Sequence, residues 1–316
     1  MRAAILFGPE DLRVEDTPEP AGEVVVEVQA ATTCGTDVKM WRYGHPVLPP
    51  YPCAFGHETA GVRADTGERV LVSDSVACGR CAPCRDGRPQ ICRSPTWILG
   101  GFAERIAAPE RALHPIPPGL PAAAAAMAEP LAAAVHAVAR GGATDDVGIV
   151  GGGPMGLMLA SLLVAEGRSV SVADHHRDRR AQADLLGARG VARLGRHQLV
   201  FEAVGRPEAW LAAVQSAAPG GVVVLVGGCP RGSEIPLATG PLHYDELELR
   251  GAFHHAPAEV DAALAALAAG SVDWELLQGA TISLEQLPAA LAQRSAGAAR
   301  KWVIDPSLRT DAARKR

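Results

Sequence analysis

The sequence predicts an α/β protein with a β-rich domain and a second domain built on a doubly wound parallel sheet. Its 316 residues are roughly twice the length typical of one domain. Short strand-like runs separated by Gly and Pro fill the first hundred residues. From residue 140 onward, strands alternate with helices, as in parallel sheets. Four prolines between residues 115 and 121 indicate a boundary near 120–130.

The composition excludes several classes of protein. Thirty basic and 35 acidic residues leave a net charge of −5 without long runs of either sign, so we expect no nucleic acid or membrane partner. The most apolar stretch, 121–140, is mostly alanine and contains Glu129 and Pro130, so it is too weakly hydrophobic to span a bilayer. The acidic start lacks a secretory pattern. We therefore expect a cytoplasmic protein, in which cysteines favour metal sites over disulfides.

Strand-like patterns dominate the first half, and Thr66-Gly67 predicts a hairpin turn. A helical stretch, 122–140, leads into the second half. The strands expected there alternate with helices at 155–166, 177–186 and 207–217, and further helices are expected at 258–269 and 284–293. The expected strands are 3–7, 23–30, 61–63, 69–73 and 102–107, then 147–150, 169–173, 199–203 and 222–226, and a final strand at 302–304.

Four cysteines lie in a loop rich in Gly, Pro and Arg, with the spacing C-x2-C-x2-C-x7-C. They are Cys78, Cys81, Cys84 and Cys92. Four thiolates close a tetrahedral shell, so we expect a structural zinc ion. The alternatives are disulfides, which a reducing compartment disfavours, and an iron–sulfur cluster, whose usual fourth spacing is absent. Cys53 and Cys229 are expected to be ordinary thiols.

A second set of metal-ligand types lies upstream, in Cys34-Gly35-Thr36-Asp37 and Gly56-His57-Glu58. A thiolate, an imidazole and a carboxylate suit zinc with a vacant position, which is typical of catalysis. Each residue alone is a weak signal, because an isolated Cys is usually core and a His-Glu pair is usually solvated.

The run Gly151-Gly152-Gly153-Pro154-Met155-Gly156 follows an expected strand and opens an apolar helix. This context favours a dinucleotide site over an ordinary glycine-rich turn. Gly151 would make the turn, Gly153 would admit the pyrophosphate to the helix N-terminus, and Gly156 would allow close packing.

Asp174 ends the next strand, where a carboxylate can bind the ribose hydroxyls and repel a 2′-phosphate. NAD is therefore favoured over NADP, although His175, His176 and Arg177 would soften the repulsion. The alternative is a solvated acid at a strand end.

The spacing between Gly187 and Leu199 is too short for a third strand and its crossover helix. Third and fourth strands of a 3-2-1-4 sheet lie about 14 Å apart, and residues 194–198 span at most about 17 Å. We expect a rudimentary third strand, no helix after it, and an adenine pocket with weaker adenosine contacts.

The order of these motifs, together with Glu129-Pro130-Leu131, resembles the zinc-dependent medium-chain dehydrogenase/reductase family, in its sorbitol-dehydrogenase-like branch. The resemblance covers nearly the whole chain. It implies a GroES-like catalytic domain over 1–130 and 255–316, with a structural zinc lobe at 78–92. It also implies a Rossmann domain over 131–254.

The resemblance further implies two zinc ions per chain. Cys34 and His57 would be ligands of the catalytic zinc, and Glu58 and Glu129 would bind it directly or through water. Asp37 would orient His57.

The same resemblance assigns the proton relay. Thr36 would contact the substrate oxygen. Many relatives carry a histidine where this chain has Lys39, so Lys39 would either complete the relay or bind substrate or cofactor instead. Independently of the resemblance, Lys301 on the final strand is expected to neutralise Glu58 or to reach the cofactor pyrophosphate, and the alternative is a solvated lysine at a strand end.

These observations favour oxidation of a secondary alcohol on a polyol, sugar or cyclitol with NAD, or the reverse reduction. One alternative is a primary alcohol or aldehyde dehydrogenase of the same family, and another is a regulatory zinc protein that binds a nucleotide. We expect a small alcohol or ketone substrate, and a homodimer or homotetramer with 247–253 as its edge strand.

Overall fold

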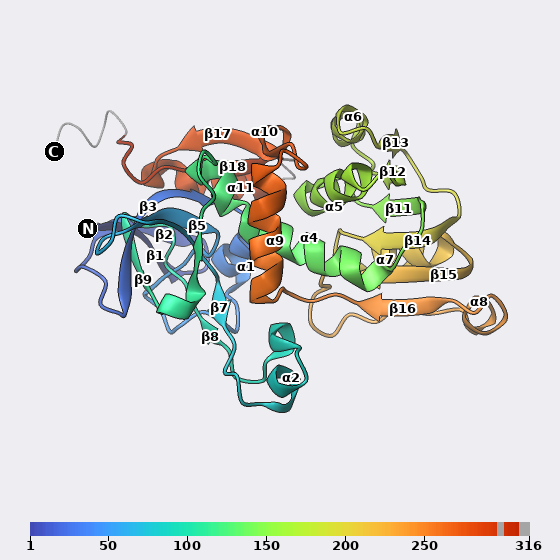
Figure 1. Cartoon of the computed structure of the whole chain (residues 1–316), viewed down its shortest axis with the longest axis horizontal. Helices are drawn as coiled ribbons and strands as arrows, with labels where there is room; N and C mark the ends of the chain where they lie inside the picture. The colour runs from blue at the N-terminus through green and yellow to red at the C-terminus, as the bar shows by residue number, and fades with distance from the viewer. Residues whose placement is uncertain (296–299, 310–316) are drawn as a thin grey trace. The chain divides into compact units, whose positions relative to one another are not determined.

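The computed structural model describes residues 1–295 and 300–309, which form two compact units (Figure 1). The first unit contains Met1–Glu129, Ala263–Ala268 and the described residues from Leu277 onward. The second contains Pro130–Ala262 and Ala269–Leu276. None of the helices in the described residues is both long and apolar enough to cross a membrane.

The first unit is β-rich, as predicted. A three-stranded sheet has the order β2-β1-β4, and a seven-stranded sheet has the order β10-β6-β5-β3-β18-β17, with β9 also paired to β3. The expected hairpin joins β5 and β6, which are antiparallel. The strands are β1 Arg2–Gly8, β2 Asp11–Asp16, β3 Val24–Thr32, β4 Cys53–Ala54, β5 Thr59–Arg63, β6 Arg69–Val72, β7 Ser75–Val76, β8 Thr96–Trp97, β9 Arg105–Ala108, β10 Leu113–Pro115, β17 Gln278–Ile282 and β18 Lys301–Ile304.

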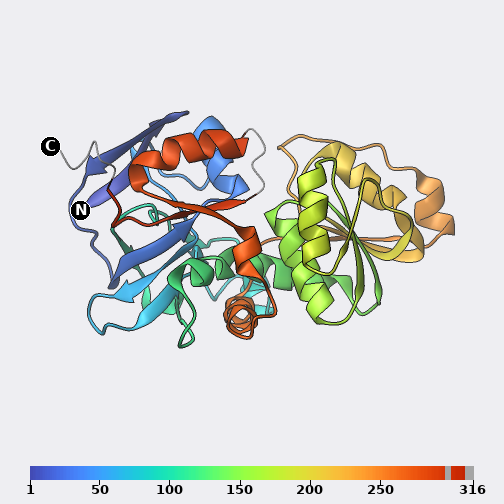
Figure 2. The same cartoon turned by 90° about the horizontal axis from the view of Figure 1, so that it is seen from above.

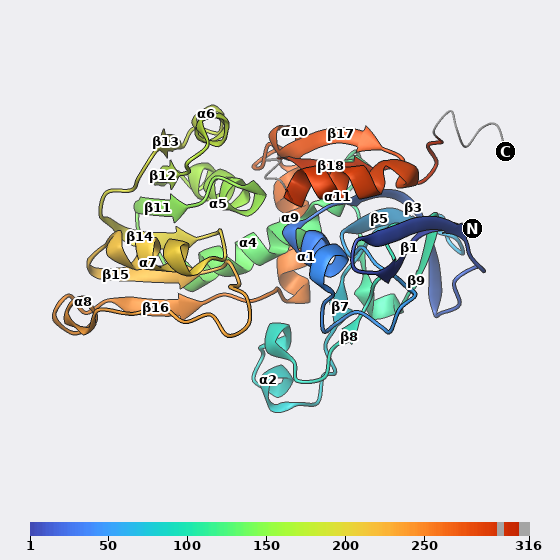
Figure 3. The ribbon, with the colours of Figure 1, turned by 180° about the vertical axis from the view of Figure 1, so that it is seen from behind.

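Helices of the first unit are short. Helix α1 packs on α11, as Figure 3 shows from behind. The sequence analysis did not predict the helices α1 and α2 or the strands β2, β4, β7, β8, β10 and β17, several of which have only two to four residues. The helical segments are α1 Gly35–Tyr43, α2 Ala82–Arg85, η1 Pro89–Ile91, η2 Glu110–Ala112, α3 Ala122–Ala126, η3 Leu284–Gln286 and α11 Leu287–Ser295.

The second unit contains a parallel sheet of six strands in the order β13-β12-β11-β14-β15-β16. Figure 1 shows these strands in this order from top to bottom. Helices α5 and α6 pack on β11–β13, and α7 packs on β14 and β15. Right-handed crossovers place these two groups on opposite faces. The strands are β11 Asp146–Val150, β12 Ser169–Ala173, β13 Arg189–Val191, β14 His197–Glu202, β15 Ala217–Leu225 and β16 Glu248–Gly251.

The remaining helices are α4 Ala128–Gly141, α5 Pro154–Ala165, α6 Arg177–Leu185, α7 Pro207–Gln215, α8 Thr239–Tyr244, α9 Pro257–Ala268 and α10 Trp274–Leu277. Helices α4, α5, α6, α7 and α9 lie within a few residues of their expected positions, whereas the short helices α8 and α10 were not predicted. Helix α9 is seen end-on in Figure 2. The Glu259 carboxylate of α9 accepts a hydrogen bond of 2.8 Å from the His136 Nδ1 of α4. This bond helps to explain why residues 255–262 group with the second unit.

The predicted truncation of the nucleotide-binding fold is confirmed. Strand β13 has only three residues, and no helix lies between Val191 and His197, both within the described part of the chain. The short connection reaches β14 directly, on the other side of β12 and β11.

The core of the first unit depends on one glycine beside the site described below. Phe55 and Phe102 meet edge to face with centroids 5.0 Å apart. Gly56, which lies between Phe55 and His57 in the chain, has φ +95°. A Cβ at this position would lie 2.6 Å from the Phe102 ring. Only glycine meets both requirements without strain.

We expect Gly56→Ala to lower the free energy of unfolding by roughly 2–5 kcal/mol, because it combines left-handed backbone strain with overpacking. Gly119→Ala is the matched control, since Gly119 has φ +82° with open space around it. That control should cost only about 1–2 kcal/mol. Urea denaturation of both variants measures the difference, and equal losses would contradict the steric argument.

Candidate active site and metal centres

Cys34 lies between β3 and α1 and serves as the N-cap of α1. Its Sγ accepts hydrogen bonds from the backbone N–H groups of Thr36 at 3.2 Å and Asp37 at 3.4 Å. The Asp37 carboxylate accepts the Cys34 N–H at 2.6 Å in return. This capping box ties the thiol to the start of the helix, so its position is set by local sequence.

His57 lies opposite Cys34 because β3 and β5 pair antiparallel, with Ala31 beside Thr59. The His57 Nε2 is 3.3 Å from the Cys34 Sγ, and Nδ1 is 3.3 Å from the Asp37 Oδ1. Burial alone would lower the pKa of His57, but Cys34 and Asp37 together raise it well above its ordinary value. Burial raises the pKa of the Cys34 thiol.

The spacing of these two donors suits a shared zinc ion. Zinc bonds of about 2.3 Å to sulfur and 2.0 Å to nitrogen at a tetrahedral angle place the two atoms roughly 3.5 Å apart. The observed separation is 3.3 Å. Asp37 reaches the second ring nitrogen, which is the arrangement that fixes a ligand tautomer. The pair therefore fits the metal that the sequence predicts.

Glu58 and Lys301 form a buried ion pair next to His57. The Lys301 Nζ lies 2.7 Å from Oε1 and 2.6 Å from Oε2 of Glu58, and both side chains are at most 2% exposed. The Thr32 hydroxyl donates a short hydrogen bond to the same carboxylate. Of the two roles expected for Lys301, this geometry favours neutralising Glu58, and a cofactor contact stays a prediction. Sequence reasoning missed Thr32, which carries no motif.

Glu129 joins the site from the first turn of α4. One carboxylate oxygen of Glu129, one of Glu58 and a ring nitrogen of His57 all lie within 4.8 Å of one another. Glu129 is 7% exposed. Burial raises the pKa of Glu58, Lys301 opposes this, and the charge of Glu129 adds to it. The predicted ligands thus form two groups that share His57, one with Cys34 and one with Glu58 and Glu129.

Helix α1 carries the predicted relay residues. Thr36 is partly buried in its first turn, and Lys39 is exposed one turn later. His45 follows the helix and is half-buried. Burial lowers the pKa of His45, and the charges of Lys39 and His57 lower it further.

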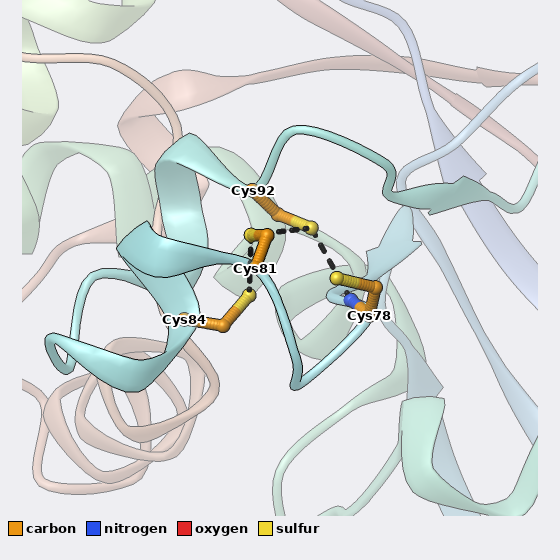
Figure 4. A group of neighbouring side chains, drawn as sticks. All are labelled: Cys78, Cys81, Cys84 and Cys92. Atoms are coloured by element: carbon orange, nitrogen blue, oxygen red, sulfur yellow. Dashed lines mark hydrogen bonds between the residues drawn. The ribbon is translucent and has the colours of Figure 1, made fainter.

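The four-cysteine loop converges as predicted (Figure 4). The Cys81 Sγ is 3.4 Å from that of Cys84 and 3.8 Å from that of Cys92, and the Cys78 N–H donates to the Cys92 Sγ at 3.2 Å. Tetrahedral zinc–sulfur bonds of about 2.3 Å place sulfurs roughly 3.8 Å apart. Backbone N–H groups of Arg93 and Cys84 lower the pKa of Cys81 to about 6, which favours a thiolate ligand.

The glycine-rich turn has the geometry expected of a nucleotide site. Gly151 has φ +106°, and its N–H donates to the Ala173 carbonyl at 2.8 Å. A Cβ on Gly156 would lie 1.8 Å from the Gly151 oxygen, so only glycine fits there. Gly153 is the N-cap of α5, with Pro154 and Met155 in the first turn and no atom within 4 Å of a built Cβ on Gly153. The helix N-terminus is open to an anion at this point.

Asp174 lies beside that turn with three donors to its carboxylate. These are the N–H groups of Gly152 at 2.9 Å and His176 at 2.8 Å, and the Arg179 Nη1 at 3.2 Å. Burial would raise the pKa of Asp174, but these donors hold it below its ordinary value. Sequence reasoning named His175, His176 and Arg177 as neighbours and missed Arg179. The signal available in the sequence was the position of Arg179, which lies five residues after Asp174 and in the first turn of the helix that follows the strand.

Comparisons with known proteins agree with this architecture. The family described as "Alcohol dehydrogenase GroES-like domain" matches residues 20–118, and that described as "Zinc-binding dehydrogenase" matches residues 154–269. The chain is similar to sorbitol dehydrogenase of Bacillus subtilis, with 29% identity over 331 residues that cover 92% of each protein.

The chain is also similar to L-threonine 3-dehydrogenase of Rhizobium rhizogenes, with 31% identity that covers 74% of this chain and 79% of that protein. Among solved structures, the alcohol dehydrogenase RspB of Escherichia coli CFT073, complexed with NADH, superposes with a TM-score of 0.88. That pair shares 26% identity over 96% of this chain and 99% of the other. The chain is therefore an enzyme that belongs to the zinc-dependent medium-chain dehydrogenases, the family that joins a GroES-like domain to a zinc-binding dehydrogenase domain.

Proposed function

We propose that this enzyme oxidises a secondary alcohol on a polyol, sugar or cyclitol with zinc and NAD, or reduces the corresponding ketone. The observation that carries the proposal is the 3.3 Å approach of the Cys34 Sγ to the His57 Nε2, with the carboxylates of Glu58 and Glu129 beside them. Similarity to sorbitol dehydrogenase supports a polyol substrate. An acidic third ligand at Glu129 also fits the branch that the sequence resembles.

We assign Cys34, His57 and Glu129 as the ligands of the catalytic zinc. The contacts of Glu58 with Lys301 and Thr32 favour a supporting role for this carboxylate near the metal. Zinc bound there would supply Lewis-acid chemistry, which makes the alcohol proton easier to remove. Cys78, Cys81, Cys84 and Cys92 would hold the second, structural zinc.

Chain residues would move the proton and hold the substrate. The Thr36 hydroxyl both donates and accepts, so it can receive the proton from the alcohol. Lys39, which stands where many relatives carry a histidine, would pass the proton onward or bind substrate or cofactor. Asp37 keeps the His57 ring oriented through Nδ1.

The nucleotide would bind on the second unit. The N-terminus of α5 is open, and Gly151, Gly153 and Gly156 carry no side chains that would block it. This geometry supports pyrophosphate binding there. Met155 would contribute a backbone N–H group of the first helical turn, whereas Pro154 has no N–H to donate. Asp174 would contact the adenosine ribose, and hydride would pass between the substrate carbon and the nicotinamide.

We also propose a cytoplasmic homodimer or homotetramer. No disulfide links the seven cysteines, all of which lie in the described residues, and this supports a reducing compartment. Strand β16 is an edge of the six-stranded sheet and is available for pairing with a second copy. Light scattering of the purified protein would measure the oligomeric state.

A substrate panel tests the proposed reaction. Polyols, cyclitols, sugar acids, L-threonine and primary alcohols are each mixed with the enzyme and NAD, and the absorbance of NADH is followed. We expect the highest kcat/KM with a vicinal secondary alcohol of a polyol or cyclitol. A clear preference for primary alcohols would contradict the substrate class and leave the metal chemistry standing.

Cys34→Ser should abolish turnover and reduce the zinc content from two ions per chain to one, because serine is a poor zinc ligand at neutral pH. Cys81→Ser is the matched control, since it exchanges the same atoms in the structural cluster. That variant should also lose one zinc ion, with a lower unfolding temperature and residual turnover. Metal analysis and NADH absorbance measure both outcomes, and full activity of Cys34→Ser would refute the mechanism.

Lys301→Met should lower the free energy of unfolding by roughly 3–5 kcal/mol, because it leaves the buried Glu58 carboxylate without its counter-charge. Adding Glu58→Gln should recover much of that loss, since the double variant buries no unpaired charge. A double-mutant cycle in urea measures the coupling between the two side chains. Additive losses would show that the ion pair does not stabilise the site.

A further inference from the structure

Glu202 is a fully buried acid at the carboxyl end of β14, and neither the zinc sites nor the glycine-rich turn uses its side chain. The chain runs from β11 to β12 on one side of β11, and β14 lies on the other side. Ligands of doubly wound sheets bind at such a switch point, outside the carboxyl ends of the strands. Glu202 therefore lies at the edge of the sheet that faces the proposed nucleotide site.

Glu202 holds the segments that follow two neighbouring strands. Its Oε1 accepts the N–H groups of Val204 and Gly205, each at 2.8 Å. Its backbone carbonyl accepts the N–H groups of Val226 and Gly227, each at 3.0 Å. One residue thus ties the segment after β14, residues 203–205, to the segment after β15, residues 226–228. We call these segments the β14 loop and the β15 loop.

The two loops also contact each other through their backbones. A Cβ on Gly227 would lie 2.2 Å from the Gly205 nitrogen, and a Cβ on Gly205 would lie 2.7 Å from the Gly228 oxygen. Trp210 of α7 adds a hydrogen bond of 2.9 Å from its Nε1 to the Gly227 carbonyl. Because no side chain fits between them, the loops form one continuous surface that the contacts of Glu202 hold in place.

The β14 loop lies against the glycine-rich turn. The Ala203 N–H donates to the Val150 carbonyl at 2.9 Å, and a Cβ on Gly151 would lie 2.6 Å from the Val204 Cγ2. Val204 is 46% exposed beside this turn. Asp174, the proposed ribose ligand, ends β12 on the other side of the turn. The nicotinamide half of the cofactor would therefore extend the opposite way, over the β14 and β15 loops.

An acid is a destabilising choice for the interior position of Glu202. Its Oε2 is buried and has no hydrogen-bond partner among residues 1–295 and 300–309. Burial raises the pKa of Glu202, and the N–H groups of Gly205 and Val204 oppose this shift. An unsatisfied buried polar atom costs stability. What the acid supplies in return is an acceptor for two N–H groups of the β14 loop, which an apolar side chain lacks.

We propose that Glu202 is a positioning residue for the nicotinamide end of the cofactor, because it holds the β14 and β15 loops together as one fixed surface for that ring. The inference rests on the nucleotide site proposed above for Gly151–Gly156. It goes beyond that site by assigning the nicotinamide half to two loops and by naming the residue that orders them. Glu202 acts through the backbone of these loops and does not touch the cofactor itself.

Calorimetric titration of the zinc-containing enzyme with NADH and with ADP-ribose, which lacks nicotinamide, separates the two ends of the cofactor without turnover. Glu202→Met keeps the size of the side chain and removes the acceptor. It should weaken NADH by about tenfold or more, because two loop N–H groups lose their partner, and change the ADP-ribose affinity by less than about twofold. Glu202→Gln keeps an acceptor oxygen and should recover most of the NADH affinity.

Hydrogen exchange of the wild type gives a second measurement that does not depend on how well a variant folds. NADH should slow the exchange of residues 203–205 and 226–228 more than ADP-ribose does, because only NADH carries the ring that would cover these loops. Equal protection by the two ligands would overturn the inference.

Asp146→Leu is the matched control, since it also replaces an acid by an apolar side chain of similar size. The Asp146 carboxylate accepts the Gln198 N–H at 3.2 Å, at the amino end of β11. This control should leave both affinities unchanged. Equal weakening of NADH and ADP-ribose by Glu202→Met, or an unchanged NADH affinity, would overturn the inference and leave the proposed function intact. If the wild type binds neither ligand, the nucleotide site and this inference fail together.

Discussion

The antiparallel register around β3 is the constraint on which the metal site depends. β3 pairs with β5 on one side and with β18 on the other. Cys34 follows the end of β3, His57 and Glu58 precede β5, and Lys301 begins β18. Three segments that are far apart in the chain therefore deliver their polar residues to one end of a sheet. A slip of one residue in either pairing would turn these side chains to the opposite face.

Burying charged side chains at this end of the sheet costs desolvation free energy. A role of these charges in function accounts for this cost better than a gain in stability does. A buried ion pair such as that of Glu58 and Lys301 contributes little net stability compared with apolar packing, because desolvation offsets the attraction. The pair nevertheless holds a carboxylate in a defined place beside His57. The Thr32 hydroxyl adds a third fixed contact to the same group. Such preorganised polar surroundings are what a zinc site needs to keep its ligands oriented.

A different constraint acts in the second unit, where backbone packs closely against backbone at the glycine-rich turn. Gly151 and Gly156 are required where the turn and α5 pack against each other, while Gly153 leaves the helix N-terminus open. The reduced β13 shortens the sheet beside Asp174 without disturbing this turn. The shortened part of the sheet and the glycine-rich turn are therefore structurally separate features of this unit.

Local sequence determined much of this protein. Periodicity and turn residues predicted most strands and helices, ligand spacing predicted the four-cysteine cluster, and the reach of an extended chain predicted the missing helix before β14. Family resemblance added the roles of Glu129 and Asp37. The sequence left several roles of Lys301 open, and tertiary structure decided that it pairs with Glu58. Tertiary structure alone showed that Thr32 donates to the same carboxylate and that Arg179 reaches Asp174. These contacts depend on strand register and side-chain direction across neighbouring elements, and a pattern read along one chain does not contain that information.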